Sequence, residues 1–305
     1  MTLTRTGFIP IPQGREPRFD HADIYHDDAG AARMYVAHTG ADRVDVIDCV
    51  ARSWLRALPD HPGVAGVLVD IGADLLFTSD RAAAQVSVYQ CSTETLLAQV
   101  GVGPRPNGLA FDSGRRRLFS FNLGEPAGEN CTASVIDLEQ HQVISTIAVP
   151  GRPRWAAYDH VTDEVYVNIR EPAEILAISA AALAVDRVIA VPADGPHGLW
   201  IDGEWLYCAA DGNALIVLHR DTGTVQASLS LPGAPDVVMH DPVLAHLYVA
   251  IGDPGLIAVA DTKSLQMIEN VPTEPGGHTL GIDPQRHAVH VFLPASRGAA
   301  VYEDR

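Results

Sequence analysis

The sequence lacks any apolar run that approaches the ~18 residues of a membrane-spanning helix. Its first residues, MTLTRTGFIPIPQG, do not show a basic start followed by an apolar stretch and a small-residue cleavage site. Such a start is the mark of a secretory signal. We therefore expect a cytoplasmic protein that does not enter a membrane.

Cysteine is scarce, and its spacing has no pattern. The four cysteines, Cys49, Cys91, Cys131 and Cys208, form no C-x-x-C pair. Zinc knuckles and disulfide frameworks need such pairs or a higher density of cysteine, so the sequence excludes both. We expect four buried free thiols.

Basic residues are also few. The chain has 21 Lys and Arg against 38 Asp and Glu, and its formal net charge is −17. Because a surface this negative repels phosphate backbones and anionic membranes, we expect neither nucleic acid nor a membrane as a partner. We predict instead that the partner is a small molecule.

Several catalytic motifs are missing. The chain has no G-x-S-x-G elbow, no G-x-x-x-x-G-K-[ST] loop, no H-E-x-x-H and no dinucleotide fingerprint. The absence of these motifs argues against serine-nucleophile and nucleotide-driven chemistry. The hydrophobic share of 47% and the charged share of 19% indicate a globular chain with a substantial core.

What the sequence does contain is a repeat. A short apolar strand ends in an aspartate every 39 to 47 residues, and segments such as RMYVAHTG and RVDVID follow it. These segments alternate in polarity and are bounded by Gly, Pro, Asp and Asn, as strands are. A period of this length is typical of four-stranded propeller blades. The seven aspartates are Asp27, Asp70, Asp112, Asp159, Asp202, Asp241 and Asp283.

The two ends of the chain indicate how the ring closes. The last unit ends at VYEDR after three strands, and GFIPIPQG near the N-terminus resembles the fourth strand of other units. Pairing these segments removes an exposed sheet edge. We therefore predict an all-β fold, one seven-bladed β-propeller domain of four-stranded antiparallel blades over 1–305. The closing strand is predicted at about 6–13, and the blades at about 19–58, 59–101, 102–150, 151–193, 194–233, 234–274 and 275–305.

The Ala-rich stretch EPAEILAISAAALAVDRV can form a short helical turn. A third strand followed by a loop fits the period better, and we assign it so.

The motifs RMYVAHTGADRVDVID, EVYVNI and HLYVAIGDPGLIAVAD resemble the YVTN-repeat, YncE-like group of propellers. The resemblance covers essentially the whole chain. It implies the propeller fold and no particular activity, because propellers of this kind include enzymes and binding proteins.

The channel mouth is where we expect function. In a propeller the innermost strand of each blade lines the central channel, and its first residues lie at the mouth. Counting five residues back from each aspartate gives one mouth position per blade. They are Ala22, Ala65, Asn107, Arg154, His197, Asp236 and His278. The alternative to a functional site is a structural channel whose polar side chains bind only water.

One arc of this ring has the composition of a metal site. His197, Asp236 and His278 come from blades 5, 6 and 7, and His21 comes from the neighbouring blade 1. Imidazoles and a carboxylate are ligands of Zn²⁺, Fe²⁺ and Mn²⁺, so we predict a divalent metal ion here. Either Asp27 or Asp28 anchors blade 1, and the direction of His21, into the channel or away from it, depends on which of them does.

The opposite arc offers groups for a substrate. Arg154 can bind a carboxylate or phosphate through two parallel hydrogen bonds, and an ion pair with Glu125 or Asp236 is the alternative. Trp155 packs beneath Arg154 or fills the core. Glu125 or Glu129, in the long blade-3 loop, is a candidate general base or a solvated loop acid.

These positions define the predicted site. Loops that follow the second strands reach the same face, and they carry His38, Asp80, Asn122, Asn168, Asp211 and Asp253. The predicted catalytic residues are Arg154, Glu125 and Asn107. The predicted substrate-binding residues are Arg154, Trp155, Asn122, Asn168 and His38.

Two functions fit this set. The first, which we favour, is a metal-dependent hydrolase or lyase, lactonase-like, that acts on a small anionic molecule at the mouth. There the metal polarises a carbonyl or lowers the pKa of bound water, and Arg154 holds the anion. The second is a non-catalytic propeller that binds a ligand or a protein.

Overall fold

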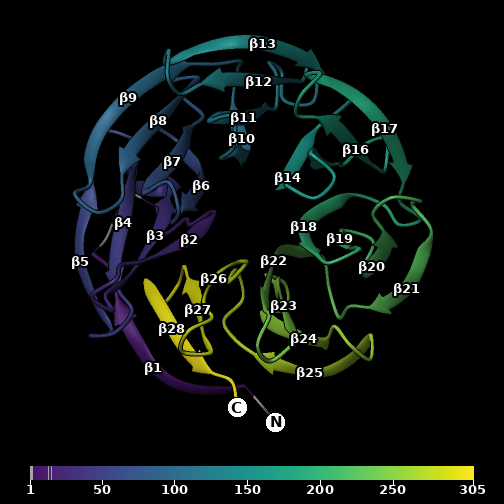
Figure 1. Ribbon diagram of the computed structural model, residues 1–305. Coiled ribbons are helices and arrows are strands. Elements are labelled where there is room, and N and C mark those ends of the chain that lie inside the picture. Colours follow the sequence, from purple (N-terminus) through teal and green to yellow (C-terminus); the bar gives the residue numbers. More distant parts are fainter. Residues whose placement is uncertain (1–2, 13, 15) are drawn as a thin grey trace.

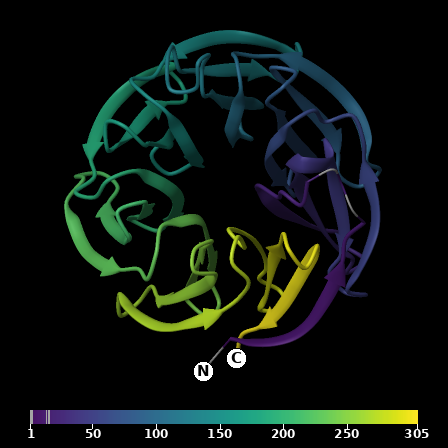
Figure 2. The ribbon, with the colours of Figure 1, turned by 180° about the vertical axis from the view of Figure 1, so that it is seen from behind.

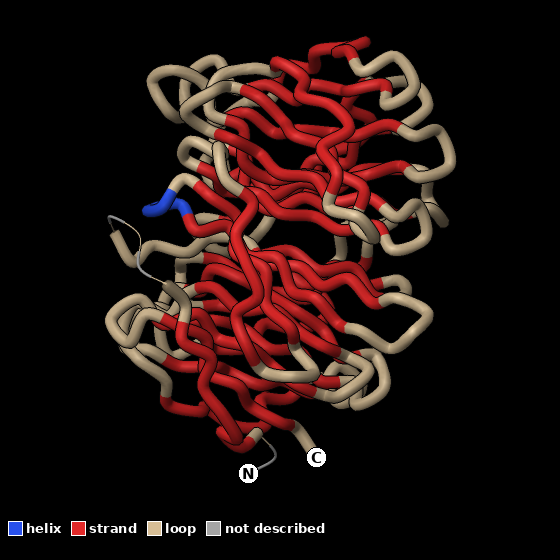
Figure 3. Tube along the Cα trace, turned by 90° about the vertical axis from the view of Figure 1, so that its left-hand side faces the viewer, coloured by secondary structure: helices blue, strands red, loops and turns tan. Residues whose placement is uncertain are grey.

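The computed structural model describes residues 3–12, 14 and 16–305. Its 28 strands form seven separate four-stranded antiparallel sheets, arranged as blades in a ring around a central channel (Figure 1). Seen from the side, loops gather at the two faces of the ring (Figure 3). The predicted all-β, seven-bladed fold is confirmed. No helix in the described residues is long and apolar enough to cross a membrane.

Each blade except the last is built from four consecutive strands, counted from the channel outward. The single 3₁₀ turn of the described chain, η1, spans Thr39–Ala41. Blade 1 contains β2 (Ala22–His26), β3 (Ala32–His38), β4 (Arg43–Asp48) and β5 (Ser53–Leu58), and blade 2 contains β6 (Val64–Asp70), β7 (Leu75–Asp80), β8 (Gln85–Gln90) and β9 (Thr95–Gly101). Blade 3 contains β10 (Pro106–Asp112), β11 (Arg117–Asn122), β12 (Thr132–Asp137) and β13 (Gln142–Ala148). Blade 4 contains β14 (Pro153–Asp159), β15 (Glu164–Ile169), β16 (Glu174–Ser179) and β17 (Ala184–Ala190). Blade 5 contains β18 (Pro196–Asp202), β19 (Trp205–Ala210), β20 (Ala214–His219) and β21 (Val225–Ser230). Blade 6 contains β22 (Pro235–Asp241), β23 (His246–Ile251), β24 (Leu256–Asp261) and β25 (Gln266–Pro272). Blade 7 contains β26 (Thr279–Asp283), β27 (Ala288–Leu293), β28 (Gly298–Glu303) and β1 (Thr4–Pro10).

The ring closes through its two ends. β1 pairs antiparallel with β28 from Thr4↔Glu303 to Pro10↔Gly298 and completes the last blade (Figure 2). The closing strand therefore begins earlier than the predicted 6–13 and ends at Pro10. Residue 13 of that range lies outside the described residues. The Ala-rich stretch of blade 4 forms β16, a turn and β17, with no helix.

Within the described structure, six of the seven recurring aspartates cap the turn after their inner strand; the exception is Asp202. Asp70 Oδ1 accepts a hydrogen bond from Ala73 N at 2.7 Å, and Asp112 Oδ1 accepts one from Arg115 N at 3.1 Å. Asp27, Asp159, Asp241 and Asp283 accept equivalent bonds from the backbone two to four residues on. Aspartate suits this position because its short side chain reaches its own turn. The aspartate repeat in the sequence therefore marks the hairpin turn between the first and second strands of each blade.

The core lies between neighbouring blades. Six of the largest fully buried side chains sit at one repeated position of the second strand: Tyr35, Phe77, Phe119, Tyr166, Tyr207 and Tyr248. Rings of this size fill the widening space between twisted sheets. The four cysteines are buried and free, as predicted.

Candidate functional site

Five inner strands carry the same β-bulge where they start at the channel mouth. In β14, Pro153 pairs with Ile169 and Ala156 pairs with Val167, so the inner strand contains one extra residue. β6, β10, β18 and β22 show the same register shift. A bulge bends its strand and re-aims side chains. The predicted mouth positions in these bulges are Ala65, Asn107, Arg154, His197 and Asp236.

Glycines let neighbouring bulges come into backbone contact. A Cβ on Gly108 would lie 2.2 Å from the carbonyl oxygen of Arg154, and one on Gly198 would lie 2.4 Å from that of Asp236. Any other residue would force the two blades apart, because real Cβ contacts are not this short. The glycines therefore fix the backbone from which the mouth side chains project.

The bulges surround a polar cavity of 160 Å³, which we call the mouth cavity. The structure brings seven predicted site residues together here: His21, Asn107, Arg154, Trp155, His197, Asp236 and His278. It adds Arg18, Asp20, Arg81, Arg105, Leu123 and Arg152.

His197 is held between two carboxylates. Its Nδ1 lies 3.0 Å from Asp211 Oδ1, and its Nε2 lies 3.1 Å from Asp236 Oδ1. Burial opposes the charge on this ring, but the two carboxylates outweigh it and raise the pKa of His197. With a carboxylate beside each ring nitrogen, the geometry favours the protonated ring, in which both nitrogens donate.

The partners of His197 titrate in the opposite direction. Burial alone would raise the pKa of Asp236, but His197, with help from His278 and His21, holds it well below its usual range. Burial would also raise the pKa of Asp211, but His197 and, after it, Arg170 lower this pKa. The acid side of the cavity is therefore internally paired.

On the arginine side of the cavity, two arginines are paired with acids and two are not. Arg81 pairs with Asp20 at 3.1 Å, and Arg105 lies 3.9 Å from Glu125. Arg152 and Arg154 form no ion pair within the described chain, and the Nε of each is buried without an acceptor. The predicted alternative, an ion pair of Arg154 with Glu125 or Asp236, is thus not what the structure shows.

The pKa values of these two arginines reflect their burial and their positive neighbours. Burial, followed by the charge of Arg152, lowers the pKa of Arg154 to about 10. Burial, followed by the charge of Arg170, lowers the pKa of Arg152. Both arginines stay protonated, so each keeps a partly desolvated positive charge beside another arginine. A bound anion would offset both the burial and the repulsion.

The predicted metal ligands line one cavity, but they do not form a ligand set as placed. His197 has no free ring nitrogen. His278 Nδ1 donates to Gly276 O at 2.9 Å, and His21 stacks on Trp155 with 4.0 Å between ring centres. Across the part of the chain that the structure describes, no three His, Cys, Asp or Glu side chains are grouped to hold a metal ion. Metal binding itself stays a prediction.

Two predicted substrate-binding residues form structural hydrogen bonds inside the propeller instead, Asn168 to backbone carbonyls and Asn122 to side-chain hydroxyls. Asn168 Nδ2 donates to the carbonyl oxygens of His197 and Gly198 at 3.0 and 2.9 Å. Asn122 Nδ2 donates to Thr132 and Ser134, at 3.0 Å each, inside its own blade. Both amides are completely buried and lie outside the cavity lining.

Two further residues lie away from the mouth cavity. The ring of His38 is buried, with its Nδ1 2.7 Å from Asp45 Oδ2 of the neighbouring strand β4. The Glu125 side chain is 67% exposed and does not line the cavity, and Glu129 is also exposed. The long blade-3 loop therefore brings no acid into the cavity.

The sequence interpretation did not single out the arginines beside Arg154. Arg105 and Arg152 each stand directly before a proline, in GPRPNG and GRPRWA, two residues before a mouth position. This repeated dipeptide is the signal that could have identified them. Arg81 and Asp211 directly follow a second strand, which brings them to the same face.

No protein-family model matches the chain, and no curated protein matches it. The fold is similar to a chain of hydrazine synthase from Kuenenia stuttgartiensis, with a TM-score of 0.81 and 14% identity over 95% of this chain and 96% of that chain. It is also similar to a chain of a mitotic checkpoint complex, with a TM-score of 0.81 and 11% identity over 98% of this chain and 91% of that chain. At such low identity the likeness shows the seven-bladed propeller fold alone.

Proposed function

We propose that this propeller binds a small organic anion in the mouth cavity. The observation that carries the proposal is the pair Arg152 and Arg154, two half-buried arginines whose Nε atoms are buried without an acceptor and which have no anionic partner in the described chain. A guanidinium binds carboxylate or phosphate through two parallel hydrogen bonds. The 160 Å³ of the cavity limits the ligand to a small molecule.

The charge of the whole protein supports a small ligand. The net charge of −17 repels polyanions, whereas the cavity concentrates positive charge at one point. A small anion can enter a positive cavity inside a negative surface, while a nucleic acid or an anionic membrane must approach the whole face. We therefore retain the small-molecule partner, and exclude nucleic acid and membrane, as parts of this proposal.

A second candidate is catalysis on the bound anion as a hydrolase or lyase, and the state of His197 favours it. An imidazolium held by Asp211 and Asp236 can protonate a leaving group, while Arg154 holds the anion beside it. The metal-dependent, lactonase-like form of this activity stays a prediction. Elemental analysis of protein purified without an affinity tag, wild type and His278→Ala, tests it.

The resemblance to YVTN-repeat, YncE-like propellers belongs to the same proposal. It rests on the repeated strand motifs, such as HLYVAIGDPGLIAVAD, in which Tyr248 is one of the buried core rings.

Titration calorimetry with a panel of mono-, di- and tricarboxylates and phosphate monoesters, at fixed ionic strength, tests the binding proposal. We expect saturable binding that Arg154→Gln weakens at least tenfold. Arg116→Gln, which removes an exposed arginine of the β10–β11 turn, is the matched control and should bind as wild type does. An anion affinity equal in both variants would contradict the proposal.

A further inference from the structure

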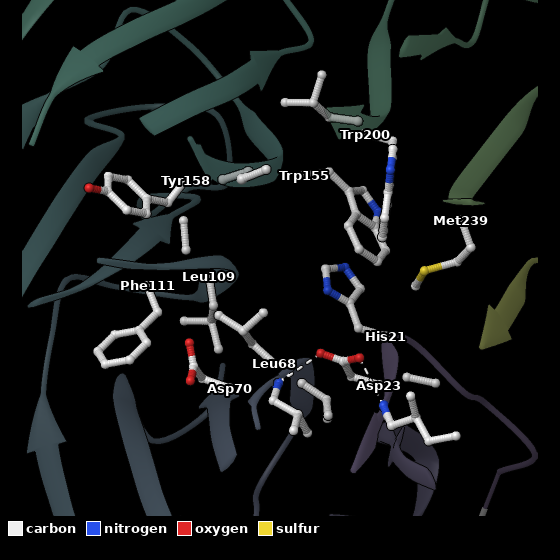
Figure 4. Close-up of a pocket in the computed structure, with 18 of the residues that line it drawn as sticks. His21, Asp23, Leu68, Asp70, Leu109, Phe111, Trp155, Tyr158, Trp200 and Met239 are labelled. Atoms are coloured by element: carbon white, nitrogen blue, oxygen red, sulfur yellow. Dashed lines mark hydrogen bonds between the residues drawn. The ribbon is translucent and has the colours of Figure 1, made fainter. Parts of the chain in front are cut away.

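A second cavity, of 480 Å³, occupies the channel along the later residues of the inner strands, and we call it the channel cavity (Figure 4). His21 and Trp155 line both cavities, so their stacked rings stand between the two. The volume lies within the ~300–1,000 Å³ typical of small-molecule sites. Ile71, which is 49% exposed, marks the edge where the cavity reaches solvent.

The walls of the channel cavity are apolar and aromatic. Side chains from several blades surround it, among them Phe111, Trp155, Trp200 and Met239 (Figure 4). Aromatic faces carry partial negative charge and attract cations as well as apolar groups. The indole Nε1 of Trp155 is buried without a hydrogen-bond partner in the described chain.

Two carboxylates face this apolar space, and no cation accompanies them. Asp23 accepts hydrogen bonds from the backbone nitrogens of Ile24 and Val69, at 2.8 and 2.7 Å, and Asp70 accepts one from Ala73 N at 2.7 Å. Neither carboxylate forms an ion pair among the described residues, and no Lys or Arg lines the cavity.

The histidines of the cavity do not supply the missing charge. Burial lowers the pKa of His21 and of His240, which favours the neutral form of both rings. The remaining titratable group of the lining is the Tyr158 hydroxyl, which donates to Asp163 Oδ1 at 3.0 Å. The fixed charge of the cavity is therefore negative.

We propose that the channel cavity binds an organic ammonium ion with an aromatic or apolar body. The ammonium group lies against Asp23, and the body lies between Trp155, Trp200 and Phe111. This site is separate from the anion site and does not depend on it. A neutral ligand would leave the Asp23 charge uncompensated, and an anionic ligand would be repelled by Asp23 and Asp70.

The titration of Asp23 agrees with this geometry. Burial, together with the nearby Asp70 charge, raises its pKa to about 6, despite two backbone hydrogen bonds that favour the charged form. A cation supplied by a ligand would stabilise the charged carboxylate.

Titration calorimetry at pH 7.5 with two probes tests the inference. The probes are 4-phenylbutylamine, which is a cation, and 4-phenylbutanol, its neutral isostere. We expect the amine to bind at least tenfold more tightly than the alcohol. Asp23→Asn should remove this preference, while Asp28→Asn, in the exposed turn after the same strand, should retain it.

A second variant locates the bound amine. Ala157 lines the channel cavity and not the mouth cavity, so Ala157→Phe should fill the channel cavity and abolish amine binding. Thermal unfolding of each variant shows whether it is folded. Equal affinities for amine and alcohol in the wild type, or amine binding that survives Ala157→Phe in folded protein, would overturn the proposal.

Discussion

His290 stands where the other blades carry a buried aromatic ring. It is the third residue of β27, as Phe77 and Phe119 are the third residues of β7 and β11. The side chain is 1% exposed, and neither ring nitrogen has a hydrogen-bond partner in the described structure. Burial lowers its pKa to about 4, so the ring is neutral in the fold. Its two unsatisfied nitrogens make it a weak point of the core.

Replacing His290 with phenylalanine should stabilise the protein by roughly 1–3 kcal/mol at pH 7, since no polar atom is then buried unpaired. The gain should be larger in acid. Between pH 6.5 and 4 the unfolded chain binds a proton that the folded ring rejects, so wild-type stability falls as the pH falls, by up to roughly 3 kcal/mol. Urea unfolding of both proteins at pH 7 and pH 4.5 measures this. Equal gains at both pH values would contradict the assignment.

The charge of His197 depends on its two carboxylates. Asp211→Asn should lower the pKa of His197, because one of two negative neighbours is lost. NMR titration of the imidazole signals measures this. Asp253→Asn, at an exposed loop acid that follows the second strand of the next blade, is the control and should leave the titration unchanged.

The sign of the stability effect follows from the raised pKa. Stability from the His197 ion pairs is fully present below the ordinary histidine pKa and is lost as the pH rises through the folded value. Asp211→Asn should therefore be most destabilising in the acid part of that range, and a uniform loss at every pH would speak against a charged His197.

At the scale of the strand, the bulge decides where the mouth side chains point. Gly108→Ala should cost roughly 1–3 kcal/mol, because its Cβ would collide with the carbonyl oxygen of Arg154 in the next blade. The same change should weaken anion binding, since it displaces the Arg154 backbone. Gly101→Ala in β9 meets nothing within 4 Å and is the matched control. Thermal unfolding and calorimetry check both effects, and similar results for the two variants would refute the proposed role of the bulge.

At the scale of the whole molecule, β1 holds the ring closed. It covers the edge of β28, and its Ile9 side chain is completely buried. Removal of residues 1–10 should lower the melting temperature and promote association, because an open strand edge pairs with other chains. Sedimentation velocity and thermal unfolding measure both effects.

A peptide of residues 3–12 added in trans should restore the closed ring and the melting temperature. The same peptide with Ile9→Asp is the control and should not, since it places a charge in the core. A truncated protein that remains monomeric and equally stable would show that closure does not depend on β1.

The sequence by itself determined the propeller. Aspartates such as Asp70 cap their own turns, and the apolar strands have a local period, so both features can be recognised along the chain. The positions of Arg154, His197, Asp236 and His278 at one mouth follow from that period as well.

Only the tertiary structure decided the chemistry of those side chains. Asp211 reaches His197 from a loop of the same blade and Asp236 reaches it from the next blade, while Arg152 and Arg154 find no ion-pair partner in the described chain and the Glu125 side chain is exposed. Such pairings depend on distances of a few ångströms within and between blades. A repeat read along one chain does not contain those distances, because packing between sheets sets them.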